Sequence, residues 1–175
     1  MSVDWYILIG VWAAGAAMLV FFVPKERSRV AQVAFLIKQL ITWVIGLVVV
    51  EIGLLEYPTR EFASINRTSF TFEFFAYPAV CALFNARYPT GSGWVKQLSY
   101  FSAYCSVMTV TEVLIEANTR LIRYDEWSWY WTWISLFLTF MGSRLFCVWF
   151  FRSYAAPGKP SGGKEKNAGN GAEDG

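Results

Sequence analysis

The chain has 175 residues, of which 55% are hydrophobic and only 16% are charged. Soluble proteins carry roughly 25% charged residues, and a soluble domain of this size cannot bury nine Trp, nine Tyr and fifteen Phe side chains. With a mean hydropathy of +0.36, the composition indicates a protein dissolved in a lipid bilayer. The absence of His excludes imidazole catalysis and His-ligated metals. A net charge of +2 is too small to favour nucleic-acid binding.

Five apolar segments predict a polytopic, all-α bundle of five transmembrane helices. The first segment lacks the basic residues that begin a signal peptide, so it is predicted to be a retained helix. Small side chains at helical spacing on this helix favour close contact with another helix; they are Gly10, Ala13, Ala14 and Ala17. The predicted helices cover 5–23, 30–55, 66–86, 94–117 and 127–151.

Two of these helices depart from a simple span. The second is longer than the hydrocarbon core, so we expect its amphipathic first turns, with Lys38, at the membrane interface. The third contains Pro78, which predicts a kink. Together the helices form a transmembrane domain over 1–154. The remainder, 155–175, is rich in Gly, Pro, Lys, Asn and Glu and predicts a disordered cytoplasmic tail.

Lys and Arg predict the orientation. With the N-terminus outside and the C-terminus in the cytoplasm, ten of these residues fall in cytoplasmic segments and four in external loops, and all six lysines lie inside. Arg144 lies within the fifth helix, where we expect it to snorkel or to form a single buried pair.

Four carboxylates lie inside the predicted helices, where a charge costs a few kcal/mol; they are Glu51, Glu73, Glu112 and Glu116. By the predicted topology all four lie in the outer half of the membrane. Polar residues extend their helix faces, because Ser69 precedes Glu73 by four residues and Thr109 precedes Glu112 by three. We expect these faces to pack together into a polar cluster that opens outward. Arginines in the external loops are possible ion-pair partners; they are Arg60, Arg67, Arg120 and Arg123.

The acidic cluster has two interpretations. It is either an ion-pair network that fixes helix register, with the arginines neutralising the acids, or a site that binds a proton, a cation or a small amine. No nucleophile motif, phosphate loop or metal signature accompanies it, so we predict no enzyme, no metal and no cofactor.

Aromatic and sulfur-containing residues suggest simpler roles. The segment WSWYWTW, which opens the fifth helix, is typical of the aromatic belt at a membrane interface. Cys81, Cys105 and Cys147 lie on three different helices without metal-ligand spacing, so we interpret them as reduced, buried, small apolar residues.

Several loop motifs occur in a fixed order between the apolar helices: EYPTR at 56–60, SFTFE at 69–73, Pro78, the Tyr88–Pro89 pair, Lys96 and the Glu112 region. With these motifs the chain resembles a family of small multi-pass membrane proteins from spore-forming bacteria of the Bacillus and Clostridium type. The resemblance covers roughly 50–150 and implies a Gram-positive plasma membrane, but no catalytic or binding residue.

Two functions follow as hypotheses. The first is a non-enzymatic protein of the bacterial plasma membrane that acts by helix-mediated assembly, with another membrane protein or a second copy as its partner. The alternative is a transporter or channel subunit with an outward-facing carboxylate pocket for a cation, a proton or a small amine.

Overall fold

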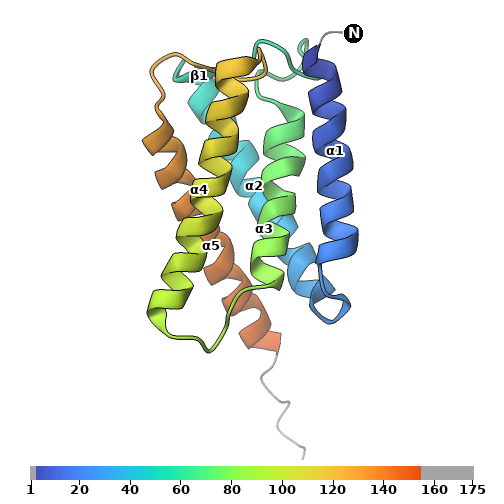
Figure 1. Ribbon diagram of the computed structural model, residues 1–175, viewed down its shortest axis with the longest axis vertical. Helices are drawn as coiled ribbons and strands as arrows, with labels where there is room; N and C mark the ends of the chain where they lie inside the picture. The colour runs from blue at the N-terminus through green and yellow to red at the C-terminus, as the bar shows by residue number, and fades with distance from the viewer. Residues whose placement is uncertain (1–2, 155–175) are drawn as a thin grey trace, which may run out of the picture.

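The computed structural model describes residues 3–154, and within this range the chain forms a bundle of five helices (Figure 1). The helices are α1 (Val3–Phe22), α2 (Ser28–Glu51), α3 (Tyr77–Ala86), α4 (Trp94–Asn118) and α5 (Trp129–Tyr154). A 3-10 turn, η1 (Lys25–Arg27), precedes α2, and a π-helical segment, η2 (Phe70–Ala76), leads into α3. The predicted all-α bundle is confirmed. The tail predicted over 155–175 lies outside the described residues.

Four helices are long and apolar enough to cross a membrane, and they cover Val3–Phe22, Lys25–Glu51, Trp94–Asn118 and Trp129–Arg152. Their outer faces expose large apolar side chains, including Phe21, Val107 and Leu138, a surface that suits lipid rather than water. The fifth, continuous over η2 and α3, is a shorter apolar helix (Phe70–Ala86). It extends only about 26 Å at 1.5 Å per residue.

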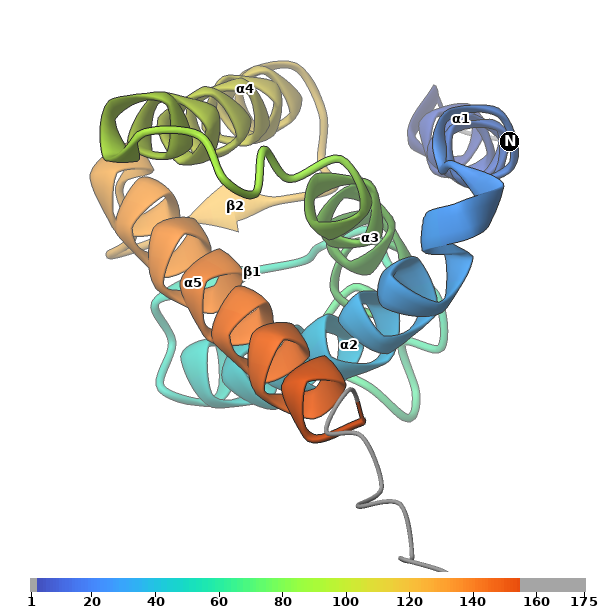
Figure 2. The ribbon, with the colours of Figure 1, turned by 90° about the horizontal axis from the view of Figure 1, so that it is seen from below.

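This short helix occupies the interior of the bundle. Seen along the helices, α3 lies between α1 and α4, while α2 and α5 cover its other side (Figure 2). It packs against α1, α2 and α5, and the Phe84 ring contacts Phe101 of α4 at 4.8 Å between centroids. Because α3 is shielded by its neighbours, polar side chains on it and on η2 can lie inside the bundle without facing lipid.

A two-stranded ribbon ties the loops together at one end of the bundle. Strand β1 (Leu55–Glu56) follows α2, strand β2 (Arg123–Tyr124) follows α4, and they pair antiparallel with Leu55 opposite Tyr124. We call this the ribbon end. The first turn of α1 lies at the ribbon end and the last turn of α5 at the opposite end (Figure 1). Which end faces the cell exterior stays a prediction.

Two helix boundaries differ from the predicted ones for local reasons. α2 ends at Glu51 rather than at 55, because Gly53 adopts a φ of +77° and the Leu54 N–H bonds back to the Val49 carbonyl at 3.1 Å, which closes the helix. The third helix begins at Phe70 rather than at 66. Ser69 precedes it in an extended conformation and accepts a hydrogen bond from the Phe72 N–H.

Candidate functional site

Glu73 is positioned by a distortion that Pro78 accounts for. Proline has no N–H for the carbonyl four residues earlier, that of Phe74, and the preceding turns widen into the π-helical segment η2. α2 supplies the missing donors. Gln39 Nε2 donates to the Phe74 carbonyl at 2.8 Å, and the Thr42 hydroxyl donates to the Glu73 carbonyl at 2.7 Å. The backbone of Glu73 is therefore held against α2.

The Glu73 side chain is buried and close to the α2 backbone. Its Oε1 accepts a hydrogen bond from the hydroxyl of Tyr57, a buried residue just after β1, at 2.7 Å. On the α2 side it lies over Gly46, where an added Cβ would be 2.8 Å from Glu73 Cδ. A residue larger than glycine would push the carboxylate away, so Gly46 makes room for this acid.

Glu112, on α4, is the second buried acid and accepts three hydrogen bonds. The Tyr77 hydroxyl donates to Oε2 at 2.5 Å, while the hydroxyls of Tyr124 and Thr132 donate to Oε1 at 2.8 and 2.9 Å. These donors come from α3, β2 and α5, so Glu112 joins three elements to α4. The Trp127 indole in turn donates to the Thr132 hydroxyl at 2.8 Å.

The phenols act as donors over a wide pH range. Burial, followed by the neighbouring carboxylates, raises the pKa of Tyr57 well above its ordinary value of 10.0. Burial and Glu112 raise the pKa of Tyr124 in the same direction. Both phenols therefore keep their protons below pH 10 and act as hydrogen-bond donors to the buried carboxyl groups.

Glu73 and Glu112 line one cavity of about 70 Å³ between α2, η2, α4 and α5. Thr42 and Thr139 also line it. The volume is enough for a few water molecules or a small hydrated ion. The aromatic side chains that line the cavity are Tyr57, Tyr77 and Trp127.

A larger groove lies on the other side of Tyr77. It has a volume of about 440 Å³ and is lined mainly by apolar side chains of α1, α3 and α4, such as Val11, Val80 and Val107. Tyr77 and Glu112 line both the groove and the small cavity. These two residues therefore form the partition between the two spaces.

The position of Lys38 differs from the predicted one. We expected it at the membrane interface, but its side chain is completely buried, and Nζ donates a hydrogen bond to the Thr139 hydroxyl of α5. It lies ten residues after the first residue of α2, or about 15 Å along the helix. The buried face of α2 has helical spacing, and Lys38 lies on that face; its buried members are Ala31, Ala34, Lys38, Thr42 and Gly46.

The other predicted members of the acidic cluster lie outside the cavity. Glu51 is the exposed last residue of α2, and Glu116 is half-buried near the end of α4. Ser69 caps η2. Thr109 is buried on the same face of α4 as Glu112, but its hydroxyl has no hydrogen-bond partner among the described residues.

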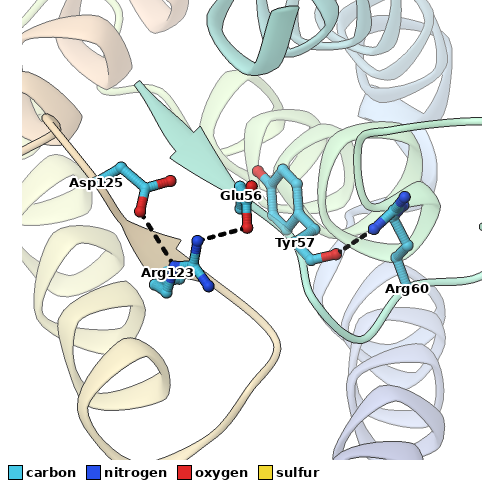
Figure 3. A network of polar contacts seen from close by, with 5 residues as sticks. All are labelled: Glu56, Tyr57, Arg60, Arg123 and Asp125. Atoms are coloured by element: carbon cyan, nitrogen blue, oxygen red, sulfur yellow. Dashed lines mark hydrogen bonds and ion pairs between the residues drawn. The ribbon is translucent and has the colours of Figure 1, made fainter. Parts of the chain in front are cut away.

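The four loop arginines that we predicted as ion-pair partners do not neutralise the buried acids. Arg67 pairs with Glu51 at 2.9 Å, while Arg123 contacts Glu56 at 2.7 Å and Asp125 at 3.1 Å (Figure 3). Arg60 donates to the backbone carbonyl of Tyr57 at 2.7 Å (Figure 3).

The fourth arginine, Arg120, is exposed, and its backbone N–H faces Asp4. Within residues 3–154 no arginine forms an ion pair with Glu73 or Glu112. Burying a guanidinium costs desolvation free energy, and Arg67, Arg120 and Arg123 accordingly lie exposed at the surface.

Other predictions gave mixed results. The three cysteines are free and buried, as expected. Arg144 is half-buried, and its guanidinium lies 4.1 Å from the centroid of the Tyr88 ring, which gives it an aromatic partner rather than an acidic one. Of the predicted aromatic belt, Trp129 and Trp131 are exposed.

Sequence reasoning missed the tyrosines that hold the carboxylates. Tyr77 could have been found, because it follows Glu73 by four residues and shares its helix face. Tyr57 and Tyr124 reach the site through the pairing of β1 with β2, two strands separated by 66 residues from Glu56 to Arg123. No local pattern in the sequence encodes that pairing.

Comparison of the chain with protein-family models, curated proteins and solved structures found no match. The resemblance to membrane proteins of spore-forming bacteria stays a prediction. The function is therefore argued from the geometry of the site.

Proposed function

We propose that this chain is an integral protein of a bacterial plasma membrane that binds one proton or one small cation between Glu73 and Glu112. In this role it is a non-enzymatic subunit of a transporter or channel. The observation that carries the proposal is the shared cavity, in which two buried carboxylates are held by hydroxyl donors rather than by arginines.

Charge compensation is the physical reason. An ionised carboxylate inside a bundle is costly unless it is paired or protonated. Neutral donors satisfy the oxygen lone pairs, but they leave the negative charge in place. Glu73 and Glu112 therefore favour a positive ligand, and the cavity between them gives such a ligand a place to bind.

The size of the cavity limits the ligand. Pockets for drug-sized molecules measure roughly 300–1,000 Å³, whereas this cavity measures about 70 Å³. A proton, a hydrated alkali cation or an ammonium ion suits this volume, and a larger amine does not. Five helices leave little room for an ion pathway through a single chain. We therefore propose that the chain works with a second copy or another membrane protein, whose helices complete the pathway.

Flux through proteoliposomes tests the proposal. We expect the substitutions Glu73→Gln and Glu112→Gln to abolish the saturable uptake of H⁺ or of Na⁺, K⁺ or ammonium, because each removes a buried charge and keeps the shape of the side chain. Glu51→Gln is the matched control, since Glu51 is exposed and pairs with Arg67. Uptake and cation binding that survive in the double Glu73→Gln, Glu112→Gln variant would refute the proposal.

A second candidate function rests on α1. The small side chains Gly10, Ala13, Ala14 and Ala17 are all exposed, and a Cβ added at Gly10 would meet nothing within 4 Å. This face is open to another helix of a partner or a second copy, as expected for helix-mediated assembly. Ala14→Leu should reduce crosslinking between chains in native membranes, while Leu138→Ile, at an exposed position of α5, should not. Equal crosslinking in both variants would refute assembly through α1.

A further inference from the structure

The buried Lys38 has no acidic partner in contact. Its Nζ donates to the Thr139 hydroxyl and lies 4.6 Å from the centroid of the Phe140 ring. The described residues contain three ion pairs, and Lys38 takes part in none of them. A buried amine that bonds only to a hydroxyl and an aromatic face is costly, so its place in the bundle calls for a functional reason.

Lys38 is linked to the wall of the cavity that Glu73 and Glu112 line. Thr42 and Thr139 line the cavity. Lys38 precedes Thr42 by one helical turn on α2 and bonds to Thr139 on α5. The ammonium is therefore one hydrogen bond away from the cavity wall.

Burial disfavours the ammonium form of Lys38, and two direct contacts favour it. The Thr139 hydroxyl donates to the Ser135 carbonyl at 2.8 Å, so its lone pairs are free to accept from Nζ. The face of the Phe140 ring attracts a cation. The titratable groups that face Lys38 from neighbouring elements are the carboxyl group of Glu73 on η2 and the thiols of Cys81 on α3 and Cys105 on α4.

We propose that Lys38 is a built-in counter-charge that limits the cavity between Glu73 and Glu112 to a single bound positive charge and excludes divalent cations. This inference rests on the proposed function and narrows its ligand class. When both carboxyl groups are ionised they carry two negative charges, and a protonated Lys38 balances one of them. One proton or one monovalent cation completes the balance, whereas a divalent cation would leave an excess positive charge in a poorly screened interior.

Removing the lysine charge tests the inference. Lys38→Gln keeps a donor for Thr139, and Lys38→Met keeps the length of the side chain without charge or donor. We expect both variants, purified in detergent or nanodiscs, to gain binding of Ca²⁺ or Mg²⁺ by titration calorimetry. The gain should be about tenfold or more, since about 1.4 kcal/mol of removed repulsion already gives that factor. Lys96→Met is the control, because Lys96 is exposed near the start of α4.

The outcomes separate this inference from the proposed function. Monovalent or proton binding by the natural chain, together with new divalent binding in the Lys38 variants but not in Lys96→Met, supports both. Intact monovalent binding with no divalent binding in folded Lys38→Gln overturns the role of Lys38 and leaves the proposed function standing. Divalent binding by the natural chain, as tight as in Lys38→Gln, also overturns it. No cation or proton binding by the natural chain overturns the proposed function itself.

Discussion

The exposed acids at the rim of the ribbon end and the buried acids inside the bundle have different partners. At the rim, Glu51 and Glu56 pair with Arg67 and Arg123. In the interior, Glu73 and Glu112 accept hydrogen bonds from tyrosine and threonine hydroxyls. The rim pairs lie where water screens their charges, whereas the interior acids have no arginine partner and lie where screening is weak. Of these four acids, Glu73 and Glu112 line the cavity that offers a positive ligand a place to bind.

The largest effect should come from removing the interior phenols. Tyr57→Phe and Tyr77→Phe each leave a buried carboxylate without one donor, so each should lower the free energy of unfolding by about 1.5–3 kcal/mol, the range for hydrogen bonds to charged groups. Denaturation in mixed micelles measures this. Tyr6→Phe is the control, because Tyr6 is exposed on α1. Equal stability of Tyr77→Phe and Tyr6→Phe would remove the distinction between rim and interior.

Filling the space beside Glu73 should have the next largest effect. Gly46→Ala places a methyl group 2.8 Å from Glu73 Cδ, and overpacking of this kind costs about 1–3 kcal/mol. The displaced carboxylate should also lose cation binding. Gly10→Ala is the matched control, since nothing lies within 4 Å of its added Cβ, and it should leave binding unchanged. Intact binding in Gly46→Ala would show that the ligand does not depend on the position of Glu73.

The rim should show the smallest effect. Arg67→Met breaks an ion pair whose side chains are 69% and 70% exposed, and such pairs contribute about 0–1 kcal/mol. We expect a small loss of stability at low salt that disappears at high salt, whereas the loss in Tyr77→Phe should persist. A large, salt-resistant loss in Arg67→Met would make the rim part of the buried network.

The sequence was informative about periodic features and poor at long-range ones. Apolar length predicted the helices, and the spacing of Thr109 and Glu112 identified a face of α4 that is buried. Lys38 was misplaced because length and amphipathicity alone suggested an interfacial first turn. The partner helix α5, which supplies Thr139, is 101 residues away in sequence. Buried polar contacts of this kind depend on how the helices pack, which local patterns do not specify.

The tyrosines show the same limit on a smaller scale. Charge alone made arginine the expected partner of each acid, and all four arginines were available in adjacent loops. The structure has tyrosines at these positions instead. A phenol can be buried because its ring is apolar and only its hydroxyl requires a hydrogen-bond partner. Tyr57, for example, is buried at 3% exposure and still reaches Glu73.

Tyr77 also lies between two spaces that differ in size and lining. On one side is the 70 Å³ chamber with the acids, and on the other is the 440 Å³ groove of mainly apolar lining. The hydrogen bond of Tyr77 to Glu112 holds its ring between the two spaces. Trimming this ring to a methyl group would join the cavity and the groove into one space. Glu112 already borders the apolar groove, and it would then lose the phenol that satisfies its carboxyl group there.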